Sequence, residues 1–421
     1  SLLEKIKLIL SSELNQGRPL KYLLEGYLKK RRSAKTDILE DTPYYKKVQL
    51  VAIKKFLNKD LRNLINNDVG PITDIIIRKI NSMGIYVYQS NILDPSKINK
   101  LVKNCVATGG IGVSFSRKEA ICKCIYEALE RYSLSLSYLD FIIKKYSEIP
   151  KNFRMDKKFL SFYNEKQRVK FKLIDATKDN LKWSVIHNAL NEKEILYPFS
   201  MITPSDIGEF IKETTSTGTA LCNTKDKALE NGLKESIERN SLMLWFYNSN
   251  KVKSKKITNL RLNKSSRKIF DFLRKGGFDL NFYLIDFLGF TTIFCTASNG
   301  KKVCLGSASG DLDKAIEKSL YEIIITFFFA ETLAKITPKN ENSIINLPQH
   351  LLYYQDKKKF AKLLDYLDSI SKDKISVAKK YPNFRKSVNI LYRKGYEVYY
   401  KEVTSPELRT HNLHVYKIIV P

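Results

Sequence analysis

The chain has 421 residues, and 43% of them are hydrophobic, including 24 Tyr and 22 Phe. This composition is typical of a folded globular protein with room for two or three domains, and it excludes wholesale disorder. Lys and Arg outnumber Asp and Glu by 73 to 44, which gives a formal net charge of +29. Such a charge indicates either an anionic partner such as nucleic acid or a genome whose base composition favours Lys along the whole chain.

The cysteines and histidines do not follow a zinc-binding pattern. The six Cys include no Cys-x-x-Cys pair, and the four His are scattered singly, so the spacing typical of zinc ligands is absent. We expect reduced thiols and a cytoplasmic location. No uninterrupted run of about 18 apolar residues and no charged-then-apolar leader is present, so we expect no membrane span and no secretion.

The first 62 residues differ in texture from the rest of the chain. They have apolar residues at helical spacing and include the basic run Lys29-Lys30-Arg31-Arg32. Because no aromatic residues interleave with this run, we interpret it as a solvated helix end or loop. We predict a helical accessory segment over 1–62 and a second, larger domain over 63–421.

In the larger domain, short β-like runs alternate with long helical patterns. The clearest strands are predicted at 85–88, 185–187, 282–285 and 414–420, and residues 335–385 are predicted to be mostly helical. This alternation predicts an α+β fold in which mixed β-sheets pack against helices.

An internal repeat is the main feature of this domain. Residues 120–136 align with 228–244, and every matched position lies 108 residues apart. A third copy begins at Ala315, keeps the Glu seven positions later, and then turns apolar over 323–325. A loop rich in small residues precedes each copy, at 108–112, 217–220 and 306–310. We therefore predict a repeated unit of strand, small-residue loop and helix.

Two of the copies carry the pattern Glu-x-x-Glu-Arg. On a helix, Glu127 shares a face with Glu130, and Glu235 shares a face with Glu238, with Arg239 one turn beyond Glu235. Burying paired carboxylates is costly, because like charges raise each other's pKa. Arginines can compensate them in internal ion pairs, or the carboxylates can bind Mg²⁺, which selects oxygen ligands and often links them to nucleotide phosphates. Spacing alone leaves both interpretations open.

Taken together, the two motifs resemble the ATP-site motifs of the YcaO superfamily. The first motif runs from Thr108 to Ser133, and the second runs from Thr217 to Phe246. The resemblance extends over residues 63–421, and two long motifs in the same order and at the same separation favour the Mg-nucleotide interpretation. Within the superfamily, the sequence is most similar to the azoline-forming cyclodehydratases of thiazole/oxazole-modified, microcin-type peptide biosynthesis.

This resemblance implies an internally duplicated ATP-binding fold and an enzyme whose cofactors are ATP and Mg²⁺. It implies that Cys, Ser or Thr in a ribosomally synthesised precursor peptide is converted to thiazoline or oxazoline through phosphorylation of the backbone amide oxygen. Thioamide-forming and amidine-forming enzymes are the alternatives within the superfamily. A basic nucleic-acid-binding protein and a pseudoenzyme that binds ATP without chemistry are the alternatives outside it.

The resemblance also assigns roles to individual residues. Mg²⁺ and the catalytic role are expected on the glutamates of the two motifs, Glu127, Glu130, Glu235 and Glu238. Arg239 is expected to be catalytic and to meet a phosphate. Asn223 and Ala220 are expected to contact the nucleotide, and Thr73 is an N-terminal candidate for the same role.

Several positions depart from the family pattern. Ile325 stands where many members have Gln, and Ile111 stands where members often have Lys. Azoline-forming members tend to end in a Pro-rich tail, whereas this sequence stops at Val420-Pro421. Either such a tail is missing from this sequence, or this member works in another way.

The resemblance implies partners as well. We expect an adenylating-enzyme-like protein to bind the leader and present the precursor peptide. A flavin-dependent azoline dehydrogenase and a second copy of this chain, forming a homodimer, are further candidates. No nucleic acid and no membrane are expected as partners.

Overall fold

The computed structural model describes residues 44–47, 50–57, 59–65, 71–80, 84–93, 109–136, 141–160, 163–203, 216–333, 352–375 and 381–421. Residues 1–43 of the predicted helical segment 1–62, including the basic run at 29–32, lie outside these residues. Within them, no helix is long and apolar enough to cross a membrane.

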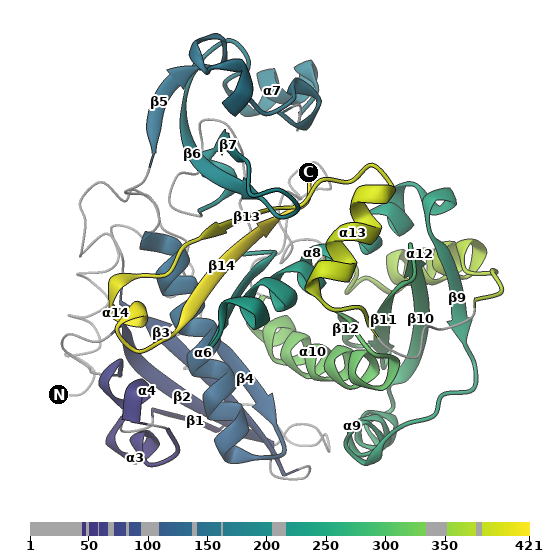
Figure 1. Ribbon diagram of the computed structural model, residues 1–421. Coiled ribbons are helices and arrows are strands. Elements are labelled where there is room, and N and C mark those ends of the chain that lie inside the picture. Colours follow the sequence, from purple (N-terminus) through teal and green to yellow (C-terminus); the bar gives the residue numbers. More distant parts are fainter. Residues whose placement is uncertain are drawn as a thin grey trace.

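The described strands form three antiparallel sheets (Figure 1). The first sheet has the order β1 (Tyr44–Lys47), β2 (Ile72–Ile80), β3 (Ile85–Ile92) and β4 (Ile111–Ser114). The second sheet has the order β5 (Ile142–Lys145), β6 (Asn180–Asn188), β13 (Tyr399–Glu402), β14 (His414–Ile419) and β8 (Thr219–Cys222), with β7 (Glu194–Pro198) paired to β6. The third sheet has the order β12 (Val303–Ser309), β11 (Phe290–Ser298), β10 (Asp279–Phe287) and β9 (Lys253–Ile257).

Each sheet has an edge strand that leads directly into a long helix. β4 is followed by α6 (Arg117–Leu136), β8 by α8 (Lys225–Tyr247), and β12 by α10 (Leu312–Leu333). These are the three copies of the sequence repeat, and in each a strand leads into the helix. The predicted small-residue loop between strand and helix was wrong in part, because residues 111–112, 219–220 and 306–309 lie within β4, β8 and β12. The hydroxyl of Thr224 accepts a hydrogen bond from the backbone N–H of Lys227 and caps the start of α8, as expected for an N-cap threonine.

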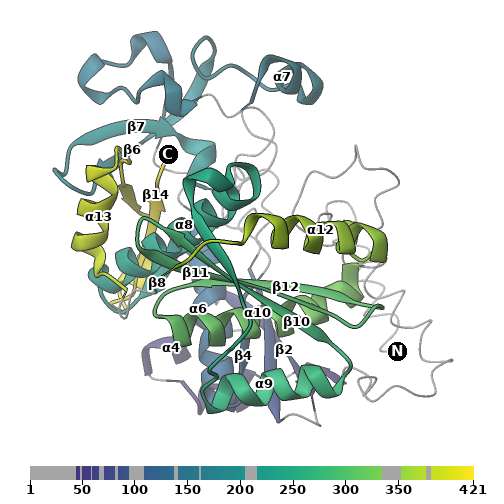
Figure 2. The same cartoon turned by 90° about the vertical axis from the view of Figure 1, so that its right-hand side faces the viewer.

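The three units are arranged as a ring. Each helix packs on its own strand and also contacts the strand of another unit, α6 on β8, α8 on β12 and α10 on β4. Figures 1 and 2 show the three helices gathered between the sheets. The same face of each helix therefore points toward the place where the units meet.

Glycine fixes how closely each strand approaches its helix. A Cβ atom at Gly110 would lie 2.1 Å from the carbonyl oxygen of Cys124, and one at Gly306 would lie 2.2 Å from the carbonyl oxygen of Ser319. Cys124 and Ser319 occupy the same position in their copies, four residues after the first Ala. The second unit reverses this arrangement, because its helix supplies Gly232, whose Cβ would lie 2.5 Å from the carbonyl oxygen of Gly218.

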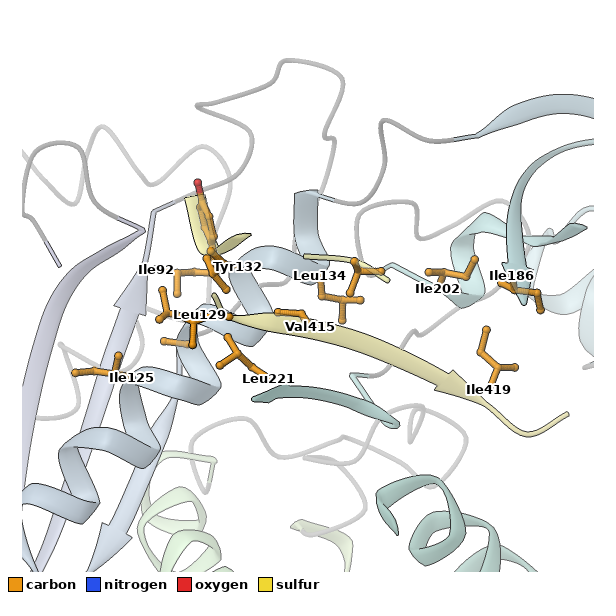
Figure 3. Packing of buried hydrophobic residues seen from close by; sticks show 14 of the residues in the cluster. Ile92, Ile125, Leu129, Tyr132, Leu134, Ile186, Ile202, Leu221, Val415 and Ile419 are labelled. Atoms are coloured by element: carbon orange, nitrogen blue, oxygen red, sulfur yellow. The ribbon is translucent and has the colours of Figure 1, made fainter. Parts of the chain in front are cut away.

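Three hydrophobic clusters hold the ring together. The first contains Ile125 and Leu129 of α6 together with Leu221 and Val415 of the second sheet, and Figure 3 shows these side chains between the helix and the strands. The second cluster lies around α8 and the third sheet. The third cluster joins α10 and the third sheet to Val113 of β4. Burial of apolar surface thus closes all three joints of the ring.

The described part of the N-terminal segment packs on this assembly. β1 pairs with β2, and α3 (Leu50–Lys54) and α4 (Lys59–Asn63) follow it. Ile53, Leu57 and Leu61 belong to the same cluster as α6. The domain boundary at residue 62 stays a prediction.

The remaining described α-helices are α7 (Glu165–Phe171), α9 (Lys264–Lys275), α12 (Lys357–Ile370), α13 (Phe384–Arg393) and α14 (Pro406–Arg409). The predicted strands at 85–88, 185–187 and 282–285 fall within β3, β6 and β10, and the one at 414–420 matches β14 to within one residue. The α+β class, with antiparallel sheets packed against helices, is confirmed.

The contact at Gly306 makes a testable prediction about stability. Replacing Gly306 by Ala should lower the free energy of unfolding by about 3 kcal/mol or more, because the new methyl group overlaps the backbone of α10. Gly277→Ala is the control: its φ is +75° and nothing lies within 4 Å of the added Cβ, so only backbone strain of about 1 kcal/mol is expected. Chemical denaturation measures both values. Equal losses would contradict a packing role for Gly306.

Candidate active site

Five glutamates gather where the three helices meet. α6 contributes Glu127 and Glu130, α8 contributes Glu235 and Glu238, and α10 contributes Glu322. Burial, together with the carboxylates of Glu127 on α6 and Glu238 on α8, raises the pKa of Glu322 to about 7. Glu322 is nevertheless accessible to solvent. The carboxylates of all three copies therefore form one interacting cluster.

The two pairs that the sequence predicted lie within this cluster. Burial, followed by the carboxylates of Glu235 and Glu127, holds the pKa of Glu130 well above its usual range. Burial raises the pKa of Glu235 to about 7, and Arg239 partly opposes this rise. Because Glu130 responds to Glu235, the first and second copies face each other across the joint between α6 and α8.

Four cations interact with the carboxylates, and one of them, Lys318 of α10, interacts with Glu238. Arg131 bonds to Glu127 at 2.5 Å and to the carbonyl oxygen of Gly109. Arg239 lies 3.8 Å from Glu238. Burial lowers the pKa of Arg239, but the carboxylates of Glu238, Glu235 and Glu322 outweigh burial and raise this pKa above its ordinary value. The fourth cation is described below. Ion pairing, the alternative that the sequence left open, is therefore present at both Glu-x-x-Glu-Arg motifs.

The fourth cation, Lys417, comes from the C-terminal strand β14. Its residue is 4% exposed, and its ammonium group donates a hydrogen bond to the carbonyl oxygen of Thr217 at 2.7 Å. Burial lowers the pKa of Lys417 to about 8, and Glu235 and then Glu130 oppose that shift. Even with Lys417 and Lys318, the five carboxylates outnumber the four cations.

Backbone N–H groups donate hydrogen bonds to the carboxylates, both within one unit and from the strand of a neighbouring unit. Glu127 accepts a hydrogen bond from the N–H of Ile111 at 2.7 Å, which lies on its own strand. Glu130 accepts one from the N–H of Leu221 on the strand of the second unit. Glu238 accepts one from the N–H of Ser309 at 3.2 Å on the strand of the third unit. Leu221 and Ser309 are equivalent, each lying three residues after the glycine of its loop.

The third joint lacks this hydrogen bond. The helix position that carries Glu130 and Glu238 in the first two copies carries Ile325 in the third. Ile325 packs against the cluster that contains Val113 of β4. The ring is therefore closed by carboxylates at two joints and by apolar contact at the third.

The other residues predicted to meet the nucleotide lie in different places. The side-chain oxygen of Asn223, just after β8, accepts a hydrogen bond from the hydroxyl of Tyr126 on α6 at 3.0 Å, so it bridges the first two units. Ala220 is buried on β8, opposite Tyr416. Thr73 lies at a register shift in β2 and donates to the carbonyl oxygen of Asn91 at 3.5 Å. That contact ties Thr73 to the first sheet rather than to the carboxylates.

The donor set of the cluster fits Mg²⁺ and a nucleotide in its chemistry. Its ligands are carboxylate oxygens in excess over the local cations, which is the donor type that Mg²⁺ prefers. The buried hydroxyl of Thr219 on β8 has no hydrogen-bond partner among the described residues. No three His, Cys, Asp or Glu side chains in the described ranges are grouped as metal ligands. The carboxylates are instead held by protein donors.

Sequence reasoning left two charged groups of this cluster without an assigned role. Glu322 was recognisable, because the third copy keeps Glu at the seventh position after Ala315, although the motif around it is lost. Lys417 gave no signal, since it lies in a strand far from every motif and reaches the cluster only through the pairing of β14 with β8.

The raised pKa of Glu235 predicts a dependence of stability on pH. Between the ordinary carboxyl value near 4.5 and about 7, the folded state binds the extra proton, so stability falls as pH rises through this window and stays reduced above it. In metal-free protein, Glu235→Gln should therefore raise the free energy of unfolding by about 1–3 kcal/mol at pH 8 and by much less at pH 5. Denaturant titrations at both pH values measure this difference.

Glu230→Gln is the matched control, because Glu230 lies on the same helix and pairs with Lys234 outside the cluster. It should change stability little and equally at both pH values. A loss of stability in Glu235→Gln at pH 8 would contradict the repulsion inferred among the carboxylates.

Comparison with known protein families finds a match over most of the chain. A family model described as YcaO cyclodehydratase, ATP- and Mg²⁺-binding, matches residues 111–421, and ATP and Mg²⁺ are the cofactors that the sequence predicted. No curated protein sequence matches the chain significantly.

Solved structures share the fold. A heterocyclase in complex with substrate and cofactor superposes with a TM-score of 0.64 at 16% identity, over 88% of this chain and 52% of its own, so this chain spans about half its length. YcaO from Methanopyrus kandleri bound with AMPPCP and Mg²⁺ gives 0.60 at 12% identity, over 88% of this chain and 89% of its own. The E. coli microcin synthetase McbBCD complex gives 0.60 at 16% identity, over 85% and 90%. With the family match covering most of its length, the chain belongs to the YcaO cyclodehydratase family.

Proposed function

We propose that this protein uses Mg-ATP to cyclodehydrate Cys, Ser or Thr residues of a ribosomally synthesised peptide. The observation that carries the proposal is the cluster of five glutamates from three repeated helices, whose carboxylates outnumber the four cations that interact with them. In this proposal, Mg²⁺ would supply the positive charge that such a cluster lacks, and the nucleotide would supply the phosphoryl group that the reaction consumes.

The reaction balances without an oxidant or reductant. The thiol or hydroxyl of the substrate residue attacks the carbonyl carbon of the preceding amide, and its proton leaves. The former amide oxygen takes the γ-phosphoryl group of ATP and departs as phosphate, while the amide nitrogen loses its proton and forms the C=N bond of the azoline. The net change is the loss of one water from the peptide.

Different residues of the chain are proposed to bind Mg²⁺, to neutralise phosphate and to orient the carboxylates. In this proposal, Glu127, Glu130, Glu235 and Glu238 hold Mg²⁺, and Arg239 neutralises phosphate charge. Phosphoryl transfer depends mainly on positioning and charge neutralisation. The backbone N–H groups of Ile111, Leu221 and Ser309 orient the carboxylates.

Asn223 is proposed to contact the nucleotide. The bond from Tyr126 to Asn223 joins α6 to the start of α8, so it fixes the amide where the first two units meet. The unpartnered hydroxyl of Thr219 lies on the adjoining strand β8 and is available to a bound group. Thr73 and Ala220 remain candidates for the same role.

The partners are proposed on the same basis. One solved structure with this fold is described as the McbBCD complex with pro-MccB17 bound, and it superposes with a TM-score of 0.59 at 16% identity over 85% of this chain and 90% of its own. This supports a precursor peptide as substrate and a separate protein that presents it. An azoline dehydrogenase and self-association are further proposals.

Replacing single glutamates tests the proposed chemistry. Glu127→Gln and Glu238→Gln should each lower peptide-dependent ATP turnover by about 100-fold or more, because even supporting residues of a metal site cost 10- to 100-fold. Glu230→Gln, outside the cluster, should keep wild-type turnover. Circular dichroism and thermal unfolding verify that the variants are folded. Wild-type turnover in both cluster variants would contradict the proposal.

Mass spectrometry of the peptide identifies the product. An azoline corresponds to the loss of one water at a Cys, Ser or Thr, whereas a thioamide exchanges oxygen for sulfur. An amidine also loses water but requires an amine nucleophile in place of the thiol or hydroxyl. ATP binding with an unmodified peptide would favour a protein that binds ATP without chemistry.

A further inference from the structure

Lys417 is a buried charge that the motifs of the sequence leave unexplained. It lies on β14, with Thr219 of β8 and Lys401 of β13 as its cross-strand partners. Only 4% of its surface is exposed. Lysine is almost never buried to this degree unless it is paired, because removing an ammonium group from water is costly.

One peptide group connects Lys417 to the carboxylate cluster. The carbonyl oxygen of Thr217 accepts a hydrogen bond from the ammonium group of Lys417 at 2.7 Å. The N–H of Gly218, at the other end of the same peptide bond, donates to Glu235. The N–H of Ile418 donates to the carbonyl oxygen of Gly218 at 2.7 Å and fixes β14 to this loop. The backbone thus holds Lys417 and Glu235 at a set separation.

The charge of Lys417 acts on the joint between the first two units. The two carboxylates that interact with it are Glu235 of α8 and Glu130 of α6. Arg131 is bonded to Glu127, and Arg239 lies beside Glu238. Glu235 interacts with Arg239 as well as with Lys417, and Lys417 is the cation that β14 adds to the joint between α6 and α8.

We propose that Lys417 is a positioning residue of the nucleotide site, which keeps Glu130 and Glu235 partly neutralised so that the site accepts both a divalent cation and the phosphates of a nucleotide. This inference rests on the proposed function. The positive charge of Lys417 weakens the binding of a metal ion alone and strengthens the binding of an anionic nucleotide. The sheet holds this charge in place whether or not ligands are bound. Its removal should therefore shift the two affinities in opposite directions, which loss of packing alone does not do.

Lys401 provides a matched control on the neighbouring strand. It pairs directly with Lys417, is 7% exposed, and donates to the carbonyl oxygen of Val185 at 3.2 Å. The electrostatic partners of Lys417 are Glu235 and Glu130, and the pKa of Glu235 responds to Lys417 in turn, whereas the hydrogen bond of Lys401 goes to β6. Removing the charge of Lys401 tests the general effect of losing a buried lysine from this sheet.

The experiment uses the full chain and two binding measurements. Electron paramagnetic resonance measures Mn²⁺ binding without nucleotide, and calorimetry measures binding of a non-hydrolysable ATP analogue with saturating Mg²⁺. In Lys417→Met, Mn²⁺ should bind about tenfold or more tighter and the Mg-nucleotide about tenfold or more weaker, which is a lower bound for one fixed charge several ångströms away in a medium of effective dielectric near 20. Lys417→Arg, which keeps the charge, and Lys401→Met should both stay near the wild-type values.

The outcomes separate this inference from the function on which it rests. If wild-type protein binds the analogue and Lys417→Met binds both ligands as Lys401→Met does, Lys417 is only structural and the inference is wrong. A parallel weakening of both affinities in Lys417→Met would overturn it as well. If the wild-type protein binds neither ligand, the proposed function fails and this inference fails with it. Should Lys417→Met not fold, Lys417→Gln, which keeps a donor for Thr217, carries the same expectations.

Discussion

Repulsion among five carboxylates is the constraint on which this structure depends. Glu127, Glu130, Glu235, Glu238 and Glu322 come from three different helices, and apolar clusters pack those helices on every side. Such crowding destabilises the folded protein unless positive charge or hydrogen bonds compensate it. Buried Lys417, the partly exposed Arg131 and Arg239, the backbone N–H groups and, in our proposal, Mg²⁺ all compensate this repulsion. The protein is strongly basic as a whole, yet its centre is acidic.

The ring of three units explains why the compensation is uneven. Close approach at Gly110, Gly218 and Gly306 brings each helix onto its strand, and each helix also contacts the strand of another unit. Two joints bind carboxylates to backbone N–H groups, whereas Ile325 closes the third with apolar contact. The three repeats have diverged, and this explains the asymmetry. The first two copies keep Glu-x-x-Glu-Arg, whereas the third keeps only Glu322 and has the apolar Ile325 at the position of the second Glu.

Local sequence was sufficient to predict the repeated unit but not the way in which the units assemble. Strand and helix periodicity located β3, β6, β10 and β14, and the repeat placed the glutamates on matching helical faces, because these signals arise from neighbouring residues. The insertion of β14 between β13 and β8 depends on pairing between residues about 200 positions apart, such as Lys417 and Thr217. No local pattern encodes that register. A lysine in a strand of mixed polarity therefore gave no indication that it would be buried beside Glu235.

The location of the metal in a nucleotide complex is the most direct test of the central claim. A crystal structure with Mn²⁺ and a non-hydrolysable ATP analogue, refined against the anomalous signal of manganese, places the metal independently of the protein model. Our account predicts manganese bound by carboxylates of Glu127, Glu130, Glu235 and Glu238, with the phosphates beside Arg239. Manganese and nucleotide bound elsewhere, with Glu127 still paired to Arg131 and Glu238 still bonded to Ser309, would contradict it.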